Sequence, residues 1–67
     1  MQSKGPNIRY WRLRKAMTQI ELATLTGIDP ATISQIETGR RKPRPSTLKK
    51  LAKALDVQPE EFFVEGP

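Results

Sequence analysis

With 67 residues the chain can form at most one small domain, and a domain of this size buries only about 60% of the surface that its unfolded chain exposes. Its 12 lysines and arginines outnumber 7 acidic residues, and the resulting net charge of +5 fits either a polyanionic partner or simply the solubility of the protein. Because the sequence has no cysteine and no histidine, disulfide bonds, thiolate metal sites and imidazole catalysis are excluded, and we expect no cofactor and no metal.

The first residues do not resemble a secretory signal, because Lys4 is followed by Gly5 and Pro6 instead of an apolar run. No segment approaches the roughly 20 apolar residues of a membrane-spanning helix, so we expect a cytoplasmic protein with no membrane partner. We interpret residues 1–6 as a loose lead-in, residues 7–64 as a single domain and residues 65–67 as a tail.

Helix-breaking residues divide the domain into short segments without an alternating strand pattern, so the sequence predicts a compact, all-α domain of five helices. The first helix is expected to end near residue 15. The second is expected to begin with a capping box formed by Thr18 and Glu21, in which the hydroxyl and the carboxylate each satisfy a free amide. It should end near Thr26, because Gly27 can adopt the left-handed conformation that closes a helix.

A third helix is expected over residues 30–38, since Asp29 and Pro30 provide a new N-cap and first turn. The short connection and the small Ala23 allow the two helices to cross at a steep angle. Two short helices separated by so few residues have the spacing of a helix-turn-helix. Apolar Ile33 and Ile36 lie on one side of the third helix. The other side is uncharged and comprises Ala31, Ser34, Gln35 and Thr38. Such side chains can approach base edges closely, but they are also common on ordinary surfaces, so this side alone leaves both interpretations open.

A basic loop, Gly39-Arg40-Arg41-Lys42-Pro43-Arg44, follows the third helix directly. A fourth helix is expected after Pro45 with Ser46 as its N-cap, and a fifth short helix is expected from Pro59. The expected core is formed by Ile8, Trp11, Leu22, Ala23, Ile28, Ile33, Ile36, Leu48, Leu51, Leu55, Val57 and Phe62.

In order and spacing, these features resemble the phage repressor and Cro (XRE-type) family of helix-turn-helix DNA-binding domains, over roughly residues 8 to 63. The matching fragments are Ile8, Arg12, MTQ at 17–19, LA at 22–23, Gly27, TISQIETG at 32–39 and LKKLAKALDVQPEEFF at 48–63. The resemblance implies a lambda-repressor-like fold and a sequence-specific transcriptional regulator that binds double-stranded DNA, with repression favoured over activation. Its recognition helix, about residues 30–38, would lie in the major groove.

The resemblance also implies roles for individual residues. Gln35 would contact a base, since its amide can pair with N6 and N7 of adenine at once. Weaker base contacts are expected from Pro30, Ala31, Thr32 and Ser34. Phosphate contacts are expected from Thr18, Gln19, Thr38, Gly39, Arg40, Arg41, Lys42 and Arg44. Arg12 and Glu37 would form an internal ion pair, the alternative being two independent surface charges.

The chain departs from the family pattern at several positions, including Pro30, where a polar residue is frequent. Ala16 stands where glycine is frequent, Thr26 stands where an aliphatic residue is frequent, and glycine or asparagine would end the fourth helix more easily than Asp56. A homodimer is also expected, free or only on a palindromic DNA operator, with Phe63 and Val64 in the dimer contact.

Other functions are weighed against DNA binding. An enzyme is not expected, because the sequence lacks a glycine-rich phosphate loop and a paired acidic site. The main alternative is a protein-interaction adaptor or antitoxin-type module that would use Leu13, Ile20 and Leu25, which fall at commonly polar positions. RNA binding ranks third, because the chain has only four aromatic residues for stacking.

Overall fold

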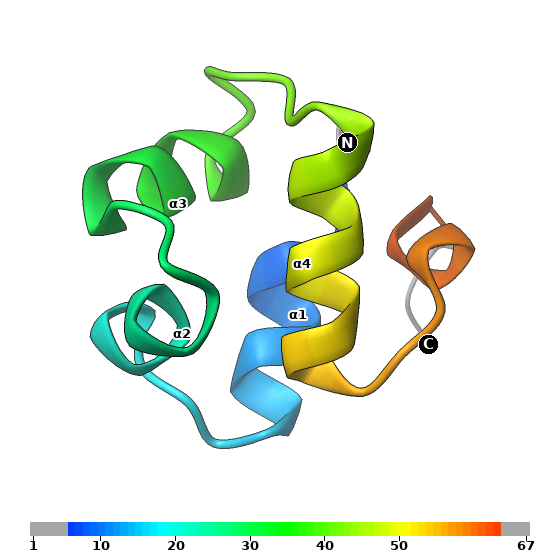
Figure 1. Cartoon of the computed structure of the whole chain (residues 1–67), viewed down its shortest axis with the longest axis horizontal. Helices are drawn as coiled ribbons and strands as arrows, with labels where there is room; N and C mark the ends of the chain where they lie inside the picture. The colour runs from blue at the N-terminus through cyan, green and yellow to red at the C-terminus, as the bar shows by residue number, and fades with distance from the viewer. Residues whose placement is uncertain (1–5, 64–67) are drawn as a thin grey trace.

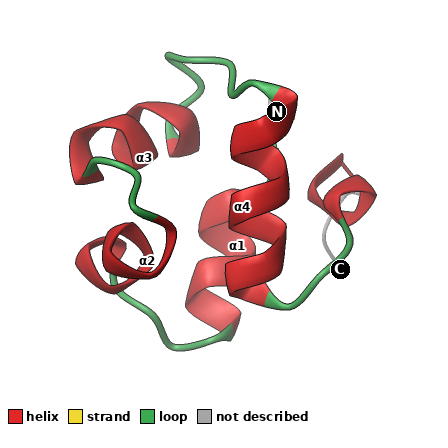
Figure 2. Ribbon diagram, in the orientation of Figure 1, coloured by secondary structure: helices red, strands yellow, loops and turns green. Residues whose placement is uncertain are grey.

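Four α-helices and one 3-10 helix make up the part of the protein that the computed structural model describes, residues 6–63. The elements are α1 (Ile8–Arg14), α2 (Gln19–Thr26), α3 (Pro30–Glu37), α4 (Pro45–Leu55) and the 3-10 helix η1 (Pro59–Phe63). Figure 2 shows only helices and loops over these residues, so the prediction of an all-α fold is confirmed.

The prediction of a fifth α-helix is wrong, because the segment after α4 is a 3-10 helix of five residues. Its backbone closes with a hydrogen bond from Glu61 N to Gln58 O at 2.9 Å. A segment this short makes too few i to i−4 bonds to offset the entropy lost in starting an α-helix. Its position is fixed by tertiary contacts instead: Phe62 is fully buried, and its carbonyl accepts from Asn7 N at 2.7 Å. The indole of Trp11 also donates to Glu61 O at 3.3 Å.

Side-chain caps determine where α2 and α3 begin. Thr18 Oγ1 accepts from Glu21 N at 3.0 Å, and Thr18 N donates to Glu21 Oε1 at 2.8 Å, so the predicted capping box is present. At the start of α3, Asp29 Oδ2 accepts from Ala31 N at 3.1 Å. Each side chain satisfies an amide that the first helical turn leaves without a backbone partner.

The start of α4 differs from the prediction. Its N-cap is Arg44 with an extended backbone, not Ser46, and Pro45 occupies the first helical position. Proline suits that position because its φ is already helical and its missing N–H would have no intrahelical partner there. Ser46 therefore lies inside the first turn, where it is exposed.

Each α-helix is followed closely by a residue with positive φ. These residues are Ala16 (55°), Gly27 (74°), Gly39 (81°) and Asp56 (59°). Glycine adopts this conformation without strain, whereas the Cβ of any other residue crowds the backbone. At the end of α1 the conformation is held by a bond from Ala16 N to Leu13 O at 2.9 Å. A second bond runs from Met17 N to Arg12 O at 3.1 Å. Ala16 therefore occupies a position that suits glycine.

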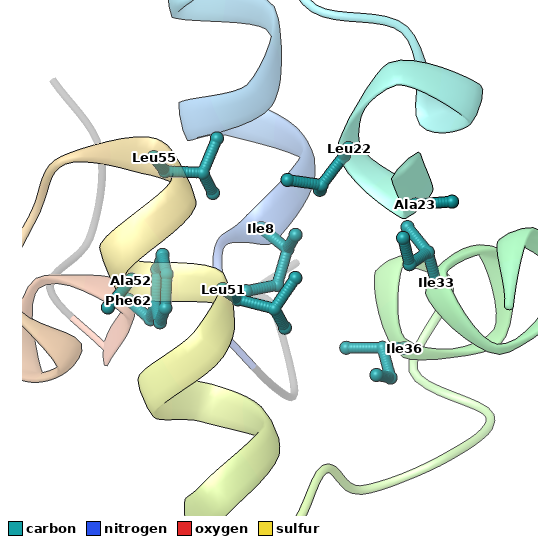
Figure 3. Close-up of a cluster of buried hydrophobic side chains, with 9 residues drawn as sticks. All are labelled: Ile8, Leu22, Ala23, Ile33, Ile36, Leu51, Ala52, Leu55 and Phe62. Atoms are coloured by element: carbon teal, nitrogen blue, oxygen red, sulfur yellow. The ribbon is translucent and has the colours of Figure 1, made fainter. Parts of the chain in front are cut away.

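One apolar core receives side chains from all five elements (Figure 3). Its buried members are Ile8, Leu22, Ala23, Ile33, Ile36, Leu51, Ala52, Leu55 and Phe62. Four predicted core residues, Trp11, Ile28, Leu48 and Val57, are only half-buried and pack against its edge. Fully burying one such Leu or Ile side chain contributes about 1.5–3 kcal/mol, so Ile33 and Ile36 hold α3 firmly against the core.

α2 and α3 lie together on one side of the molecule, and η1 lies on the opposite side of α4 (Figure 1). Only residues 27–29 separate α2 from α3, and the two helices contact each other. They form the predicted helix-turn-helix. Over residues 6–63, every helix is too short or too polar to cross a bilayer.

Candidate nucleic-acid interface

The two sides of α3 differ in burial as well as in composition. Ile33 and Ile36 are 0% and 2% exposed. On and around the opposite side, Ala31 and Thr38 are exposed, and Pro30, Thr32, Ser34 and Gln35 are half-buried. None of these six side chains carries a charge. The helix is thus anchored by one side and offers an accessible polar surface on the other.

The end of α3 directs the basic loop, which leads from α3 to the start of α4 (Figure 1). Arg40 N donates to Gln35 O at 2.8 Å, and Gly39 N donates to Ile36 O at 3.2 Å. This pair of bonds is the Schellman arrangement, which turns the chain sharply at a left-handed residue. It places the exposed cations of the loop, Arg40, Arg41, Lys42 and Arg44, directly after the end of α3.

A hollow lies where α3, the loop and the start of α4 meet. It is lined by Thr32, Ile36, Arg41, Lys42, Pro43, Arg44 and Thr47. The lining combines cations with hydroxyl groups and contains no carboxylate. Nowhere in residues 6–63 do three or more acidic side chains gather in a way that could hold a metal ion. The chemistry of this hollow suits an anion such as a phosphate.

Two of the predicted phosphate donors already have partners within the protein. Thr38 Oγ1 donates to Ser34 O at 3.0 Å, and Gly39 N donates to Ile36 O. A hydroxyl has one proton to donate, and so has a backbone amide. The Thr38 hydroxyl and the Gly39 amide therefore donate to carbonyls in the last turn of α3. The cations of the loop remain as the donors that can bind an anion.

The ion pair that the resemblance implies is present between α1 and the end of α3. Arg12 Nε donates to Glu37 Oε2 at 2.7 Å, and Arg12 Nη2 donates to Glu37 Oε1 at 3.1 Å. Their side chains are 9% and 2% exposed. The hydrogen bond to Glu37 raises the pKa of Arg12 above its usual value, although burial acts in the opposite direction. Arg12 Nη1 also donates to Met17 O at 2.9 Å, so one guanidinium links three segments of the chain.

Gln19, the predicted phosphate contact at the start of α2, is half-buried and joins this network. Its Nε2 donates to Glu37 Oε1 at 2.9 Å. One amide proton is thus committed to Glu37, and a second proton on the same nitrogen is left for a ligand. The neighbouring Thr18 is exposed, and its hydroxyl oxygen already accepts within the capping box.

Gln35, the predicted base contact, has a side-chain partner that the sequence analysis does not predict. Arg41 Nε donates to Gln35 Oε1 at 2.9 Å. The two residues are six positions apart, on either side of the turn at Gly39, and neither helical periodicity nor a motif links such a pair. The contact follows from the way in which the Schellman turn brings the loop back toward α3.

Four large apolar side chains remain exposed at other places on the described part of the surface. Leu13, Ile20, Leu25 and Phe63 are 53%, 63%, 62% and 60% exposed. Ile20 and Leu25 belong to an open hollow that is also lined by Lys15, Ala16, Met17, Glu21 and Thr24. Val64, the other predicted dimer residue, lies outside the described residues. The surface around α2 is thus more apolar than a typical solvent-facing helix.

Comparisons with known sequences agree with this geometry. The helix-turn-helix family HTH_3 matches residues 8–62. The HTH-type transcriptional repressor RghR of Bacillus subtilis is 44% identical over 67 residues, which cover 98% of this chain and 50% of that protein. The chain thus spans about half the length of this curated relative.

Solved structures show the same fold. The restriction-modification controller protein C.AhdI of Aeromonas hydrophila superimposes with a TM-score of 0.82 at 37% identity, covering 85% of this chain and 86% of that one. The DNA-binding domain of the P22 C2 repressor superimposes with a TM-score of 0.84 at 28% identity, covering 94% and 86%.

Proposed function

The chain belongs to the helix-turn-helix family, and from this premise we propose that it is a sequence-specific, DNA-binding transcriptional regulator. The observation that carries the proposal is the surface of α3. The polar side of α3 is uncharged and accessible, and the apolar side of the helix is buried in the core. A run of exposed cations follows the helix. An α-helix with these properties fits the major groove of B-DNA.

Bases and phosphates would be contacted by different parts of this surface. Gln35 reads a base, and the short side chains of Ala31, Thr32 and Ser34 let the helix approach the groove closely. The exposed cations of the loop neutralise flanking phosphates, which supplies affinity without sequence information. Gln19 adds a phosphate contact through its second amide proton.

The buried network gives this surface its rigidity. Glu37 sits at the last position of α3 and accepts hydrogen bonds from Arg12 in α1 and Gln19 in α2. The end of the recognition helix is therefore fixed to both neighbouring elements. A rigid helix loses little conformational entropy when it enters the groove, so more of the contact energy remains for binding.

Salt dependence of duplex binding tests the proposal. If each subunit contacts about five phosphates, a plot of log K against log salt concentration should have a slope near −4.5 per subunit. Binding constants measured by fluorescence anisotropy on labelled duplexes at several salt concentrations give this slope. Failure to bind any duplex in dilute buffer would overturn the proposal.

We propose further that the protein represses transcription as a homodimer on a palindromic operator. RghR, the Bacillus subtilis relative, is named a repressor. A single recognition helix touches only a few base pairs, whereas a two-fold dimer reads two half-sites and gains specificity. Reporter expression from a promoter that overlaps a palindromic duplex sequence bound by the protein should fall when the protein is supplied.

A protein-interaction adaptor is the second candidate function, and the exposed Leu13, Ile20 and Leu25 favour it. In an adaptor these residues would dock on another protein, and the polar side of α3 would remain free. The salt experiment separates the two functions, because an adaptor has no reason to bind duplex DNA tightly or with a steep salt dependence.

A further inference from the structure

The amide oxygen of Gln35 accepts a hydrogen bond from the guanidinium of Arg41, and this contact affects which base Gln35 can recognise. We propose that Arg41 determines the base preference of Gln35 and shifts it from adenine to guanine. The inference rests on the proposed function, since it specifies how the α3 surface discriminates between base pairs. Arg41 then acts as a specificity-determining residue through Gln35 as well as by its charge.

The geometry fixes the orientation of the amide. Arg41 Nε lies 2.9 Å from Gln35 Oε1. Of the two polar atoms of a glutamine amide only the oxygen can accept a hydrogen bond, and a guanidinium can only donate. The Gln35 nitrogen therefore points away from Arg41, and both of its protons are free to meet a ligand from that side.

The backbone supports the same arrangement. Gln35 O accepts from Arg40 N at 2.8 Å and from Arg41 N at 3.2 Å. These bonds hold the start of the loop against the last turn of α3. Arg41 therefore reaches Gln35 from a fixed backbone position.

The paired side chains present a different pattern to DNA from that of a free glutamine. A free glutamine offers one acceptor and one donor, which match N6–H and N7 of adenine. When Arg41 occupies the oxygen, the pair offers the two protons of Gln35 Nε2 and the remaining guanidinium protons. Guanine presents two acceptors, N7 and O6, in the major groove, whereas the N6–H of adenine would have to donate to the remaining lone pair of an oxygen that already accepts from a positively charged group.

Selection from random-sequence duplexes with four proteins tests the inference: the wild type, Gln35→Ala, Arg41→Ala and Arg40→Ala. The Gln35→Ala variant identifies the base position that Gln35 reads, because preference is lost there. Arg40→Ala is the matched control, because it removes the same charge as Arg41→Ala. Arg40 is also exposed and, like Arg41, comes directly after the turn at Gly39. Circular dichroism checks that all four proteins are folded.

We expect guanine at that position for the wild type and for Arg40→Ala, and adenine for Arg41→Ala. Two duplexes that differ only there should be distinguished about tenfold in favour of G·C by the wild type, which corresponds to about 1.4 kcal/mol. Arg41→Ala should reverse this ratio, while both arginine variants should weaken binding overall by a similar factor.

Three results would overturn the inference while leaving DNA binding intact. The wild type could select adenine at the position, Arg41→Ala could keep the wild-type ratio, or Gln35→Ala could leave every position unchanged. If the wild type enriches no duplex at all, the proposed function itself fails, and the inference fails with it.

Discussion

Arg12 and Glu37 join α1 to the end of α3 through two hydrogen bonds, of 2.7 and 3.1 Å, between side chains that are almost fully buried. Glu37 also accepts from Gln19 at the start of α2. One carboxylate therefore holds three helices together at the base of the helix-turn-helix. A buried charge is tolerated only when it is paired, so the two residues depend on each other.

Removal of either partner is expected to destabilise the protein strongly. Arg12→Ala or Glu37→Ala should each lower the free energy of unfolding by about 3–5 kcal/mol, because each strands the other charge in the interior. The double variant Arg12→Met/Glu37→Leu should lose less than either, since no charge is left unpaired and the volume is largely retained. Urea unfolding at one pH of the two single variants and of Arg12→Ala/Glu37→Ala measures the coupling, and additive losses in this cycle would contradict the paired interpretation.

Ala16→Gly is expected to stabilise the protein by about 0.5–1 kcal/mol. Ala16 has a φ of 55°, where a Cβ is strained, and relief of this strain outweighs the extra entropy that glycine gives the unfolded chain. Thermal unfolding followed by circular dichroism should show a Tm higher by a few degrees. An unchanged or lower Tm would mean that the αL strain at this position does not exceed the entropic cost of introducing glycine.

Gly39→Ala is the reciprocal test at the end of α3. A Cβ at Gly39, where φ is 81°, would meet no atom within 4 Å, so any loss comes from the backbone conformation alone. We expect a loss of about 1–2 kcal/mol in the same unfolding assay. The two substitutions together separate backbone strain from packing.

Local signals in the sequence were sufficient to predict most of the helix boundaries. The capping box at Thr18 and the turn at Gly27 act within a few residues, so they can be recognised without tertiary information. One boundary and one helix type differ from the prediction, each for its own reason. At α4 two neighbouring residues offered competing signals, and Pro45 prevailed over Ser46 because proline fits only the first turn. At η1 the tertiary contacts of Phe62 favoured a tighter helix than the helix-start signal at Pro59 indicated.

The residues of the candidate surface could be proposed from the sequence, and the resemblance implied the Arg12–Glu37 ion pair, but most of the side-chain contacts could not be predicted. Periodicity identified the polar side of α3, and composition identified the basic loop. Neither periodicity nor composition could reveal that Gln35 accepts a hydrogen bond from Arg41 or that Gln19 donates one to Glu37. Such bonds join side chains from different segments, and they depend on the turns that place those segments side by side.

Arg40→Ala is expected to weaken binding to all duplexes about equally. An exposed loop cation contributes through counterion release, so its removal should flatten the log–log salt slope by about 0.9 without changing base preference. Gln35→Ala should instead relax discrimination at one position by about 1–3 kcal/mol and leave the slope unchanged. Anisotropy titrations on matched and mismatched duplexes at several salt concentrations distinguish the two effects. A change of base preference in Arg40→Ala would show that this side chain does more than neutralise phosphate.

Ile20→Ser and Leu25→Ser are expected to leave both stability and DNA affinity nearly unchanged. The two side chains are more than 60% exposed, and surface substitutions usually change the free energy of unfolding by less than about 0.5 kcal/mol. Titrations on the selected site and urea unfolding check both points. A large loss of regulation in cells with unaltered DNA binding would indicate that this apolar surface binds another protein, in support of the adaptor function.

Phe63→Ala is expected to reduce cooperative binding to a palindromic site without destabilising the monomer. Phe63 lies at the end of η1 and is 60% exposed, so its truncation removes little from the core, whereas Phe62 beside it is fully buried. If Phe63 packs against its symmetry mate, the second half-site, about 34 Å from the first, should be filled less readily in the variant. Sedimentation velocity on duplexes with one or two half-sites measures this directly. A wild-type protein that stays monomeric on the palindrome, or a variant with unaltered cooperativity, would remove Phe63 from the dimer contact.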